Sequence, residues 1–307
     1  MQQQVEQKPS EEAFNEFIRY CKVKNLAKDS IIFYENCYKS FTKFYPMQST
    51  VNGITLYTIQ DYILYQKQCN ISPISINSNL RGVRAFLYYC MKLDYLNKFQ
   101  IELIKAEKKV KQVYSDAELK ILLKKPHVKN ISFAEYRDWV IINYVVGTGN
   151  RVSTIINIKI KDIDFENGYI TMQKTKNKKQ QVIPFSNTLS AVLSEYLTYR
   201  KGQPDDYLFC NSFGTQLCDR SLQGDIARYN KSRGVMKTSI HLFRHTFAKK
   251  WILAGGDIFR LQKILGHSSL EIVKEYINMF SDDLKQDFNQ FNPLEQMNAK
   301  KEYMRVR

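Results

Sequence analysis

Apolar residues at helical spacing fill most of this chain, and one short basic stretch interrupts them. Near the start, the spacing of three and four residues that marks one face of a helix is seen at Phe14, Phe17, Ile18 and Cys21. Between residues 104 and 114 the sequence IKAEKKVKQVY turns basic and loses this spacing, which predicts a linker. The chain therefore divides into a helical unit over 10–103 and a second unit that begins at about 115.

The length and the apolar content set the scale of each unit. At about 150 residues a domain, 307 residues make two domains, each long enough to bury its own core. A hydrophobic fraction of 44% excludes a disordered chain. No apolar run approaches the roughly 18 residues that span a bilayer, and the first residues are polar, unlike a secretory signal. We expect a soluble protein of the cytoplasm.

The charge balance indicates the kind of partner. Lys and Arg number 46 against 30 Asp and Glu, a net charge of +16, which favours nucleic acid first and an acidic membrane surface second. A solvated lysine-rich surface would give the same total. Lys outnumbers Arg by 33 to 13, so the position of an arginine is more informative than that of a lysine.

The cysteines and histidines predict no metal site. Six cysteines are spread through the chain without a Cys-x-x-Cys pair, so neither a zinc site nor a disulfide framework is expected. We expect the cysteines to be reduced and mostly to pack in the core. Since His, Cys and carboxylate residues form no cluster with ligand spacing, the sequence implies no metal and no cofactor.

The first unit is predicted to be a small all-α domain. Asp29-Ser30 and Asn77-Ser78 are expected to cap helices, because short polar side chains accept hydrogen bonds from the N–H groups of a helix start. Pro73 is expected after the end of a helix.

The second unit combines helices with three short strands. Ser115 and Glu118 have the spacing of a capping box, which predicts a helix start. The tripeptide Glu166-Asn167-Gly168 is a strong hairpin signal. The expected elements are a helix over 133–146, strands over 163–165, 169–173 and 181–183, and helices from 190 to about 280. This pattern predicts a helical domain with a small antiparallel sheet.

Two local patterns bring basic residues to turns. A glycine turn over 147–150 places Arg151 at the opening turn of a helix, where N–H groups and the helix dipole attract phosphate. A lysine-rich stretch over 174–179 joins two of the predicted strands. Taken singly, the glycine turn also fits a solvated arginine, and the lysine-rich stretch also fits an exposed hairpin tip.

Two further patterns lie near the C-terminal end of the second unit. His241 and Arg244 are one turn apart on a predicted helix, so both can reach one ligand. Gly266 ends another helix, His267 follows it, and Tyr276 comes nine residues later. Tyr276 shares an apolar stripe with its neighbours, so taken alone it is equally a core tyrosine.

In this order and spacing the four patterns resemble the catalytic set of the tyrosine recombinases, the lambda-integrase-type family that includes the Xer-like recombinases. The similarity covers about residues 10–285. Two departures stand out. Thr154 replaces the acidic residue that the family usually has three positions after its first arginine, and residues 271–275 read EIVKE where the family is commonly Thr-rich.

The resemblance implies a mainly α fold with a small antiparallel β-sheet. An all-α N-terminal core-binding (SAM-like) domain would span 10–103 and a basic linker 104–114. The α+β tyrosine-recombinase catalytic domain would span 115–285, and a C-terminal tail, which could exchange between protomers, 286–307. The two domains would form a C-shaped clamp on DNA.

The resemblance also implies a mechanism in which DNA strands are cleaved and rejoined through a Holliday junction, without ATP or metal. Tyr276 would be the nucleophile of a covalent 3′-phosphotyrosyl intermediate. Arg151 and Arg244 would stabilise the reacting phosphate. His241 would manage the proton of the tyrosine or bind a phosphate oxygen, and His267 would donate a hydrogen bond to the same phosphate.

A lysine of the hairpin stretch would be the general acid for the leaving 5′ oxygen. Counting back eight positions from Pro184, as the family's hairpin suggests, selects Lys176, with Lys174 and Lys178 as the alternatives.

Further basic residues are candidates for contacts to double-stranded DNA: Arg81, Arg84, Lys105, Lys108, Lys109, Lys111, Arg220, Arg228 and Lys231. We expect a monomer in solution and a homo-tetramer in the synaptic complex, with no membrane partner. A short apolar stripe of Leu284, Phe288 and Phe291 is expected to dock on a neighbouring protomer, the alternative being that it packs on its own domain.

Two other functions fit parts of the pattern. A type IB topoisomerase shares the phosphotyrosine chemistry without exchanging partners, and a non-catalytic DNA-binding regulator could use the same fold. The reacting residues favour a recombinase of prokaryotic, phage or mobile-element origin, acting in chromosome or plasmid resolution or in the integration of a small mobile element.

Overall fold

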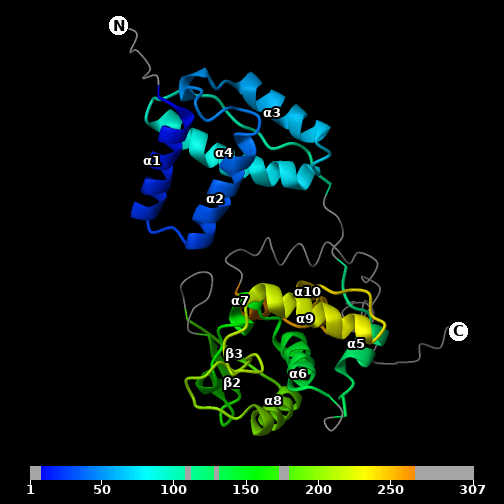
Figure 1. Ribbon diagram of the computed structural model, residues 1–307. Helices are drawn as coiled ribbons and strands as arrows, with labels where there is room; N and C mark the ends of the chain where they lie inside the picture. The colour runs from blue at the N-terminus through cyan, green and yellow to red at the C-terminus, as the bar shows by residue number, and fades with distance from the viewer. Residues whose placement is uncertain (1–7, 108–111, 128–130, 173–179, 267–307) are drawn as a thin grey trace, which may run out of the picture. The chain divides into compact units, whose positions relative to one another are not determined.

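The computed structural model describes residues 8–107, 112–127, 131–172 and 180–266 (Figure 1). The chain divides into two compact units, residues 1–109 and 110–307, and the division falls inside the stretch predicted as a linker. The described residues are mostly helical, with one small antiparallel sheet, so the predicted fold class is confirmed. None of the described helices is long and apolar enough to cross a membrane.

The first unit is built around its longest helix. Its elements are α1 (Ser10–Val23), α2 (Lys28–Phe41), the 3₁₀ turn η1 (Val51–Gly53), α3 (Leu56–Gln68) and α4 (Pro73–Lys92). α4 packs against the other three helices. Phe14 and Tyr38 stack with ring centroids 3.8 Å apart, and Phe86 of α4 meets both rings edge-on. These aromatic contacts join α1, α2 and α4 in one core.

Both predicted helix caps of the first unit are wrong. Asp29 lies inside the first turn of α2, which begins at Lys28. Pro73, in contrast, follows the end of α3 at Gln68, as predicted, and is also the first residue of α4. Ser72 caps α4 by accepting from the Ser75 N–H at 3.3 Å. The helix start favours proline because its fixed φ suits the first turn and its missing N–H has no helical partner there.

Asn77 lies inside α4 and holds a distant segment instead of capping a helix. Its side-chain amide donates to the Ile104 carbonyl at 2.8 Å and accepts from the Ile104 N–H at 2.9 Å. This paired bond fastens the first residue of the predicted linker to the core of the first unit.

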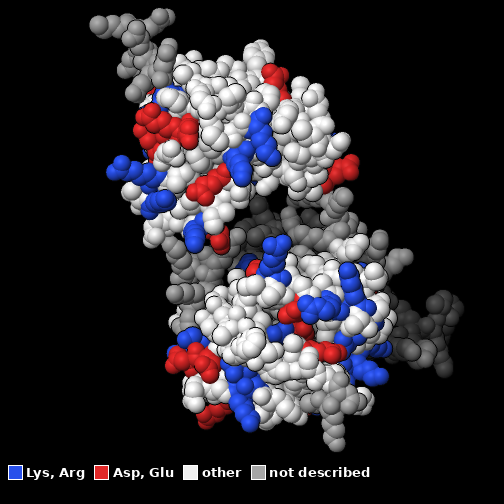
Figure 2. Space-filling view, viewed as in Figure 1, with Lys and Arg blue, Asp and Glu red and all other residues white. Residues whose placement is uncertain are grey.

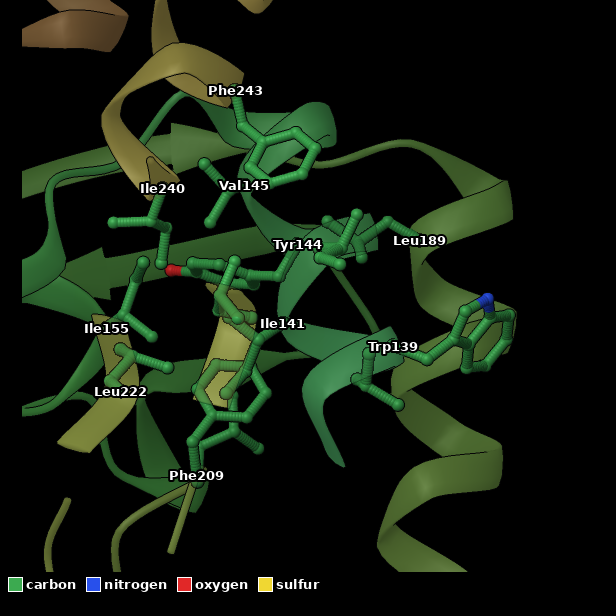
Figure 3. Close-up of a cluster of buried hydrophobic side chains, with 14 of the residues drawn as sticks. Trp139, Ile141, Tyr144, Val145, Ile155, Leu189, Phe209, Leu222, Ile240 and Phe243 are labelled. Atoms are coloured by element: carbon green, nitrogen blue, oxygen red, sulfur yellow. The ribbon is translucent and has the colours of Figure 1, made fainter. Parts of the chain in front are cut away.

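The second unit surrounds one buried helix, α6 (Phe133–Thr148). The other elements are α5 (Asp116–Leu123), α7 (Val152–Ile155), the 3₁₀ turn η3 (Ile160–Asp162), β1 (Ile163–Asp164), β2 (Tyr169–Met172), β3 (Gln181–Pro184), α8 (Asn187–Arg200), α9 (Asp219–Ser232), α10 (Ile240–Leu253) and α11 (Ile258–Leu265). α6 contacts α5, α8, α9 and α10, and Figure 1 shows it between the α9–α10 pair and α8. Figure 3 shows Tyr144 of α6 enclosed by buried side chains of the neighbouring elements.

The predicted capping box and sheet of the second unit are confirmed. Ser115 and Glu118 cap α5 reciprocally, at 3.2 and 2.7 Å. The sheet has the order β1-β2-β3 with antiparallel pairs, and Met172 pairs with Gln181 at the far end of the β2–β3 ladder. Gly168 completes the β1–β2 turn with a φ of 71°, a conformation that glycine adopts without strain.

Most of the cysteines are buried, as predicted for packing residues. All six lie in the described ranges and are free; Cys21, Cys37, Cys90 and Cys210 are buried, while Cys69 and Cys218 are exposed.

One glycine sets how closely α2 and α4 approach. A Cβ at Gly82 would lie 2.4 Å from both Cβ and Sγ of Cys37, which are buried and cannot move aside. By contrast, a Cβ at Gly224 on the exposed side of α9 would meet nothing within 4 Å.

These two glycines make a matched pair for mutation. Gly82→Ala is expected to destabilise the first unit by about 1–3 kcal/mol, because overpacking forces the helices apart. Gly224→Ala is expected to stabilise the second unit by about 0.5–1 kcal/mol, because alanine restricts the unfolded chain. Scanning calorimetry of the full chain measures both, and an unchanged melting temperature for Gly82→Ala would contradict the close contact.

Candidate active site

The turn between α6 and α7 is held rigidly to α6. Gly149 ends α6 with a φ of 64° and donates its N–H to the Val145 carbonyl at 2.8 Å. The buried Asn150 donates its side-chain N–H to the Tyr144 hydroxyl at 2.7 Å. Burial raises the pKa of Tyr144 above its usual range, so this hydroxyl stays neutral. Arg151 follows directly, at the N-terminal boundary of α7, as predicted.

Arg244 comes to this turn from α10. Its side chain is only 6% exposed, and it donates to the Gly149 carbonyl at 2.6 Å and to the Leu265 carbonyl at 2.7 Å. His241 lies one turn earlier on the same helix and is exposed. The guanidinium is therefore fixed by main-chain acceptors from two segments that are far apart in the sequence.

The two arginines meet at one oxygen atom. Arg151 donates its Nη1 hydrogen to the same Leu265 carbonyl at 3.1 Å, so the two guanidinium groups lie side by side. Leu265 is the last residue of α11, and the C-terminal end of a helix carries a partial negative charge that attracts cations. Two rigid forks of N–H donors held together in this way suit an anion with several oxygens, such as a phosphate.

The chain leaves this cluster at Gly266. This residue ends α11 with a φ of 61°, and a Cβ there would lie 2.7 Å from Oε1 of Gln181 and 3.6 Å from Nη1 of Arg151. Its N–H donates to the Gln262 and Lys263 carbonyls, so the helix end predicted at Gly266 is confirmed. The other residues predicted for the active site, Lys176, His267 and Tyr276, lie outside the described residues, as do Lys174 and Lys178.

A family comparison places this cluster among known proteins. Residues 112–282, more than half of the chain, match the phage integrase family. The chain belongs to the phage integrase family. Since the named relatives below are tyrosine recombinases, this chain is a recombinase enzyme of that class, and the resemblance seen in the sequence is confirmed.

Two bacterial relatives align with nearly the whole integrase. Tyrosine recombinase XerC of Staphylococcus aureus strain USA300 is 27% identical over 298 residues, which cover 93% of this chain and 97% of that protein. Tyrosine recombinase XerC of Bacillus subtilis strain 168 is 28% identical over 293 residues, which cover 90% and 95%.

Solved structures share the fold. The Tn1549 transposon integrase in complex with transposon right end DNA matches with a TM-score of 0.72 at 19% identity, over 92% of this chain and 99% of that one. The XerH site-specific recombinase bound to a palindromic difH substrate matches with a TM-score of 0.69 at 22% identity, over 90% and 83%.

Thr154, which departs from the family pattern, lies in α7 and donates its N–H to the Arg151 carbonyl at 2.9 Å. Its side chain lines a cavity of about 300 Å³ together with the buried carboxyl of Asp162, which accepts from the Lys159 N–H at 2.9 Å. Thr154 of α7 and Asp162 of η3 therefore border the same cavity.

The basic residues predicted to contact DNA lie on both units. Arg81 of α4 and Lys105 are exposed and Arg84 is half-buried, while Arg220 and Lys231 are exposed on α9. Lys108, Lys109 and Lys111 lie outside the described residues. Figure 2 shows Lys and Arg spread over the visible face of each unit with Asp and Glu between them. On this face, therefore, the basic residues are interleaved with acidic ones.

Among the candidates that the structure describes, Arg228 is part of an ion-pair network. It donates to Oδ1 of Asp225 at 3.0 Å, while the other oxygen of Asp225 accepts from the buried Arg137 at 2.7 Å. Arg137 also bonds Asp138 through two nitrogens, at 3.0 and 2.6 Å. A phosphate at Arg228 would have to compete with this carboxylate.

The helix that carries Arg244 is fastened to the end of the predicted linker, an arrangement that the sequence analysis missed. Tyr114 stacks on Phe243 with ring centroids 4.1 Å apart, and its N–H donates to Oγ1 of Thr246 at 2.9 Å. Its hydroxyl donates to the Lys237 and Ser239 carbonyls just before α10, at 3.1 and 3.3 Å. Burial raises the pKa of Tyr114 above its usual range, which keeps this donor protonated.

Removing the acceptor at Thr246 tests this fastening. Thr246→Val keeps the shape but leaves the buried Tyr114 N–H without its hydroxyl acceptor, which is expected to cost about 1–3 kcal/mol of unfolding free energy. Thr198→Val on the exposed face of α8 also removes a hydroxyl bonded to a main-chain carbonyl, at 2.7 Å, and is expected to change stability by less than about 0.5 kcal/mol. Urea unfolding compares the two, and equal stabilities would contradict the role of Thr246.

Proposed function

We propose that this integrase is a site-specific DNA recombinase of the cytoplasm that cleaves and rejoins strands through a covalent 3′-phosphotyrosyl link to Tyr276. The observation that carries the proposal is the meeting of Arg151 and Arg244 at the Leu265 carbonyl. The chain runs from that atom through Gly266 to His267, and Tyr276 follows nine residues later.

The paired arginines would supply the main electrostatic stabilisation of the reaction. As the phosphate passes through its transition state, negative charge grows on its non-bridging oxygens, and donors already fixed in place stabilise that charge without reorganising. Arg244 is buried and tied to two carbonyls, so little freedom is lost when a phosphate binds. This pre-organisation favours catalysis over simple attraction to DNA.

The bond changes follow from the residue types. The Tyr276 oxygen attacks phosphorus, a P–O bond to tyrosine forms, and the bond to the 5′ oxygen breaks. Lys176 donates a proton to that leaving oxygen, while His241 takes the tyrosine proton or binds a phosphate oxygen, and His267 donates a hydrogen bond to the phosphate. The phosphotyrosyl link retains the energy of the broken phosphodiester. A 5′ hydroxyl of a partner strand therefore reverses the step without ATP. Two such strand exchanges pass through a Holliday junction.

The partner in this proposal is a double-stranded DNA recombination site. The Tn1549 integrase and XerH structures contain DNA substrates, and they share the fold of this chain. The net charge of +16 supplies the non-specific attraction that precedes recognition and weakens as salt rises. The exposed Arg81, Lys105 and Arg220 are the described residues proposed to contact phosphates first.

Replacement of the nucleophile tests the proposal. The full chain is incubated with a pool of duplexes that carry a randomised segment and one nick, and covalent adducts are separated under denaturing conditions and sequenced. The wild type is expected to enrich one family of sites, whereas Tyr276→Phe is expected to bind the same duplexes without forming an adduct. Tyr199→Phe changes an exposed tyrosine of α8, 48% exposed, and is expected to react like the wild type.

An adduct formed by Tyr276→Phe would show that another residue is the nucleophile. A wild type that binds DNA without any adduct would indicate a non-catalytic regulator. Relaxation of a supercoiled plasmid that lacks the enriched site would indicate a topoisomerase.

The proposed tetramer is tested by shortening the chain. The apolar stripe of Leu284, Phe288 and Phe291 lies outside the described residues and is proposed to dock on a neighbouring protomer. A chain that stops at residue 283 is expected to bind a single site with affinity within about twofold of the full chain but to lose synapsis, because burial of such a stripe stabilises the assembly by several kcal/mol. Native gel electrophoresis separates the two complexes, and equal loss of both would contradict the docking role.

A further inference from the structure

A glutamine of the small sheet reaches the same helix end that holds the two arginines. Gln181 is the first residue of β3, and its Nε2 donates to the Ile264 carbonyl at 2.9 Å and to the Lys263 carbonyl. Its amide oxygen faces Gly266, where a Cβ would come within 2.7 Å. The sequence analysis did not single out Gln181, because its partners lie more than 80 residues away.

These contacts complete the hydrogen bonding of the last turn of α11. A helix ends with four carbonyls that have no partner within the helix. Here the Gly266 N–H donates to the Gln262 and Lys263 carbonyls. The Gln181 side-chain amide donates to the Lys263 and Ile264 carbonyls, and the two arginines donate to the Leu265 carbonyl. The turn is thus held between the sheet and the arginine pair.

The position of Gln181 in the sheet gives these contacts a consequence for the lysine stretch. Gln181 pairs with Met172 at the end of the described β2–β3 ladder, and in the sequence the lysine-rich stretch lies between these two residues. Lys176 lies five positions before Gln181. β3 is an edge strand and is paired with β2 on one side only. The hydrogen bonds from Gln181 to α11 hold the start of this strand in place.

We propose that Gln181 is a positioning residue. It hydrogen-bonds the start of β3, just after the lysine-rich stretch in the sequence, to the C-terminal turn of α11, and in this way it positions the general-acid lysine relative to the phosphate-binding arginines. The inference rests on the proposed function. The arginines keep their own bonds to Gly149 and Leu265, so the part that depends on Gln181 is the delivery of the proton to the leaving oxygen.

The link itself is tested without DNA. Gln181→Leu keeps the bulk of the side chain and removes the two donated bonds, while Gln180→Leu changes the exposed neighbouring glutamine and leaves them in place. Hydrogen exchange of the full chain is expected to speed up several-fold at the amides of residues 181–183 and 261–266 of Gln181→Leu and to stay unchanged in Gln180→Leu. Unchanged exchange in both variants would overturn the link.

The consequence for chemistry is tested on the duplex enriched by the wild type. Single-turnover cleavage by Gln181→Leu is expected to fall about 10- to 100-fold, a share of the ~10²–10⁴ that a positioned acid contributes, while duplex binding stays within about twofold. Gln180→Leu is expected to cleave like the wild type. Equal losses in binding and cleavage would overturn a positioning role.

A sulfur-substituted substrate separates acid delivery from phosphate binding. When sulfur replaces the bridging 5′ oxygen, the thiolate leaves without a proton, so Lys176→Ala and Gln181→Leu are both expected to recover most of the wild-type rate, whereas Arg244→Lys is not. If Lys176→Ala recovers and Gln181→Leu does not, the inference is overturned. If the wild type forms no adduct on any duplex, the proposed function fails, and hydrogen exchange alone decides whether Gln181 ties β3 to α11.

Discussion

The carbonyl oxygen of Leu265 accepts hydrogen bonds from two arginines, and this contact joins the α6–α7 turn, α10 and the end of α11 in the candidate active site. Two guanidinium groups that share one acceptor atom carry like charges and repel each other. The negative end of α11 offsets part of that repulsion, because a helix C-terminus acts as roughly half a negative charge. The pair can therefore be assembled before any anion arrives, and an incoming phosphate would take over a role that the main chain already performs.

The two arginines are held in place by main-chain carbonyls, so the backbone geometry of the turns at this site determines where they lie. The acceptors are the carbonyls of Gly149 and Leu265, and the residues that turn the chain beside them, Gly149 and Gly266, have φ values of 64° and 61°. A Cβ at Gly149 would lie 2.5 Å from the ring of Phe247 and 2.8 Å from Leu265. The close approach of α10 and α11 to the α6–α7 turn thus requires glycine, and the buried Asn150 locks the turn from the other side.

Local rules predicted the parts of the structure whose causes are local. The capping box at Ser115 and the hairpin at Gly168 involve neighbours within four residues, and both are confirmed. Asn77 has the right chemistry for a cap, but its partner Ile104 is 27 residues away, so its role could not be predicted from spacing. The same holds for Tyr114 and Gln181, whose contacts depend on the tertiary fold. Within the site, residue types and order predicted the two arginines together, whereas no sequence pattern identifies a main-chain carbonyl as their common acceptor. The reacting roles of Lys176, His267 and Tyr276 stay predictions.

The linker is attached to the first unit at Ile104 and to the second unit at Tyr114, and this has a consequence for the dissociation of the protein from DNA. Ile104 is clamped by Asn77 in the first unit, and Tyr114 is held against α10 in the second, so ten peptide steps join the two anchors, about 35 Å when fully extended. If both units bind DNA, as proposed, a unit that detaches remains covalently joined to the unit that is still bound, which favours rebinding over loss of the protein. The affinity of each unit for DNA can then be low, so that one unit moves along the duplex while the other keeps the protein bound.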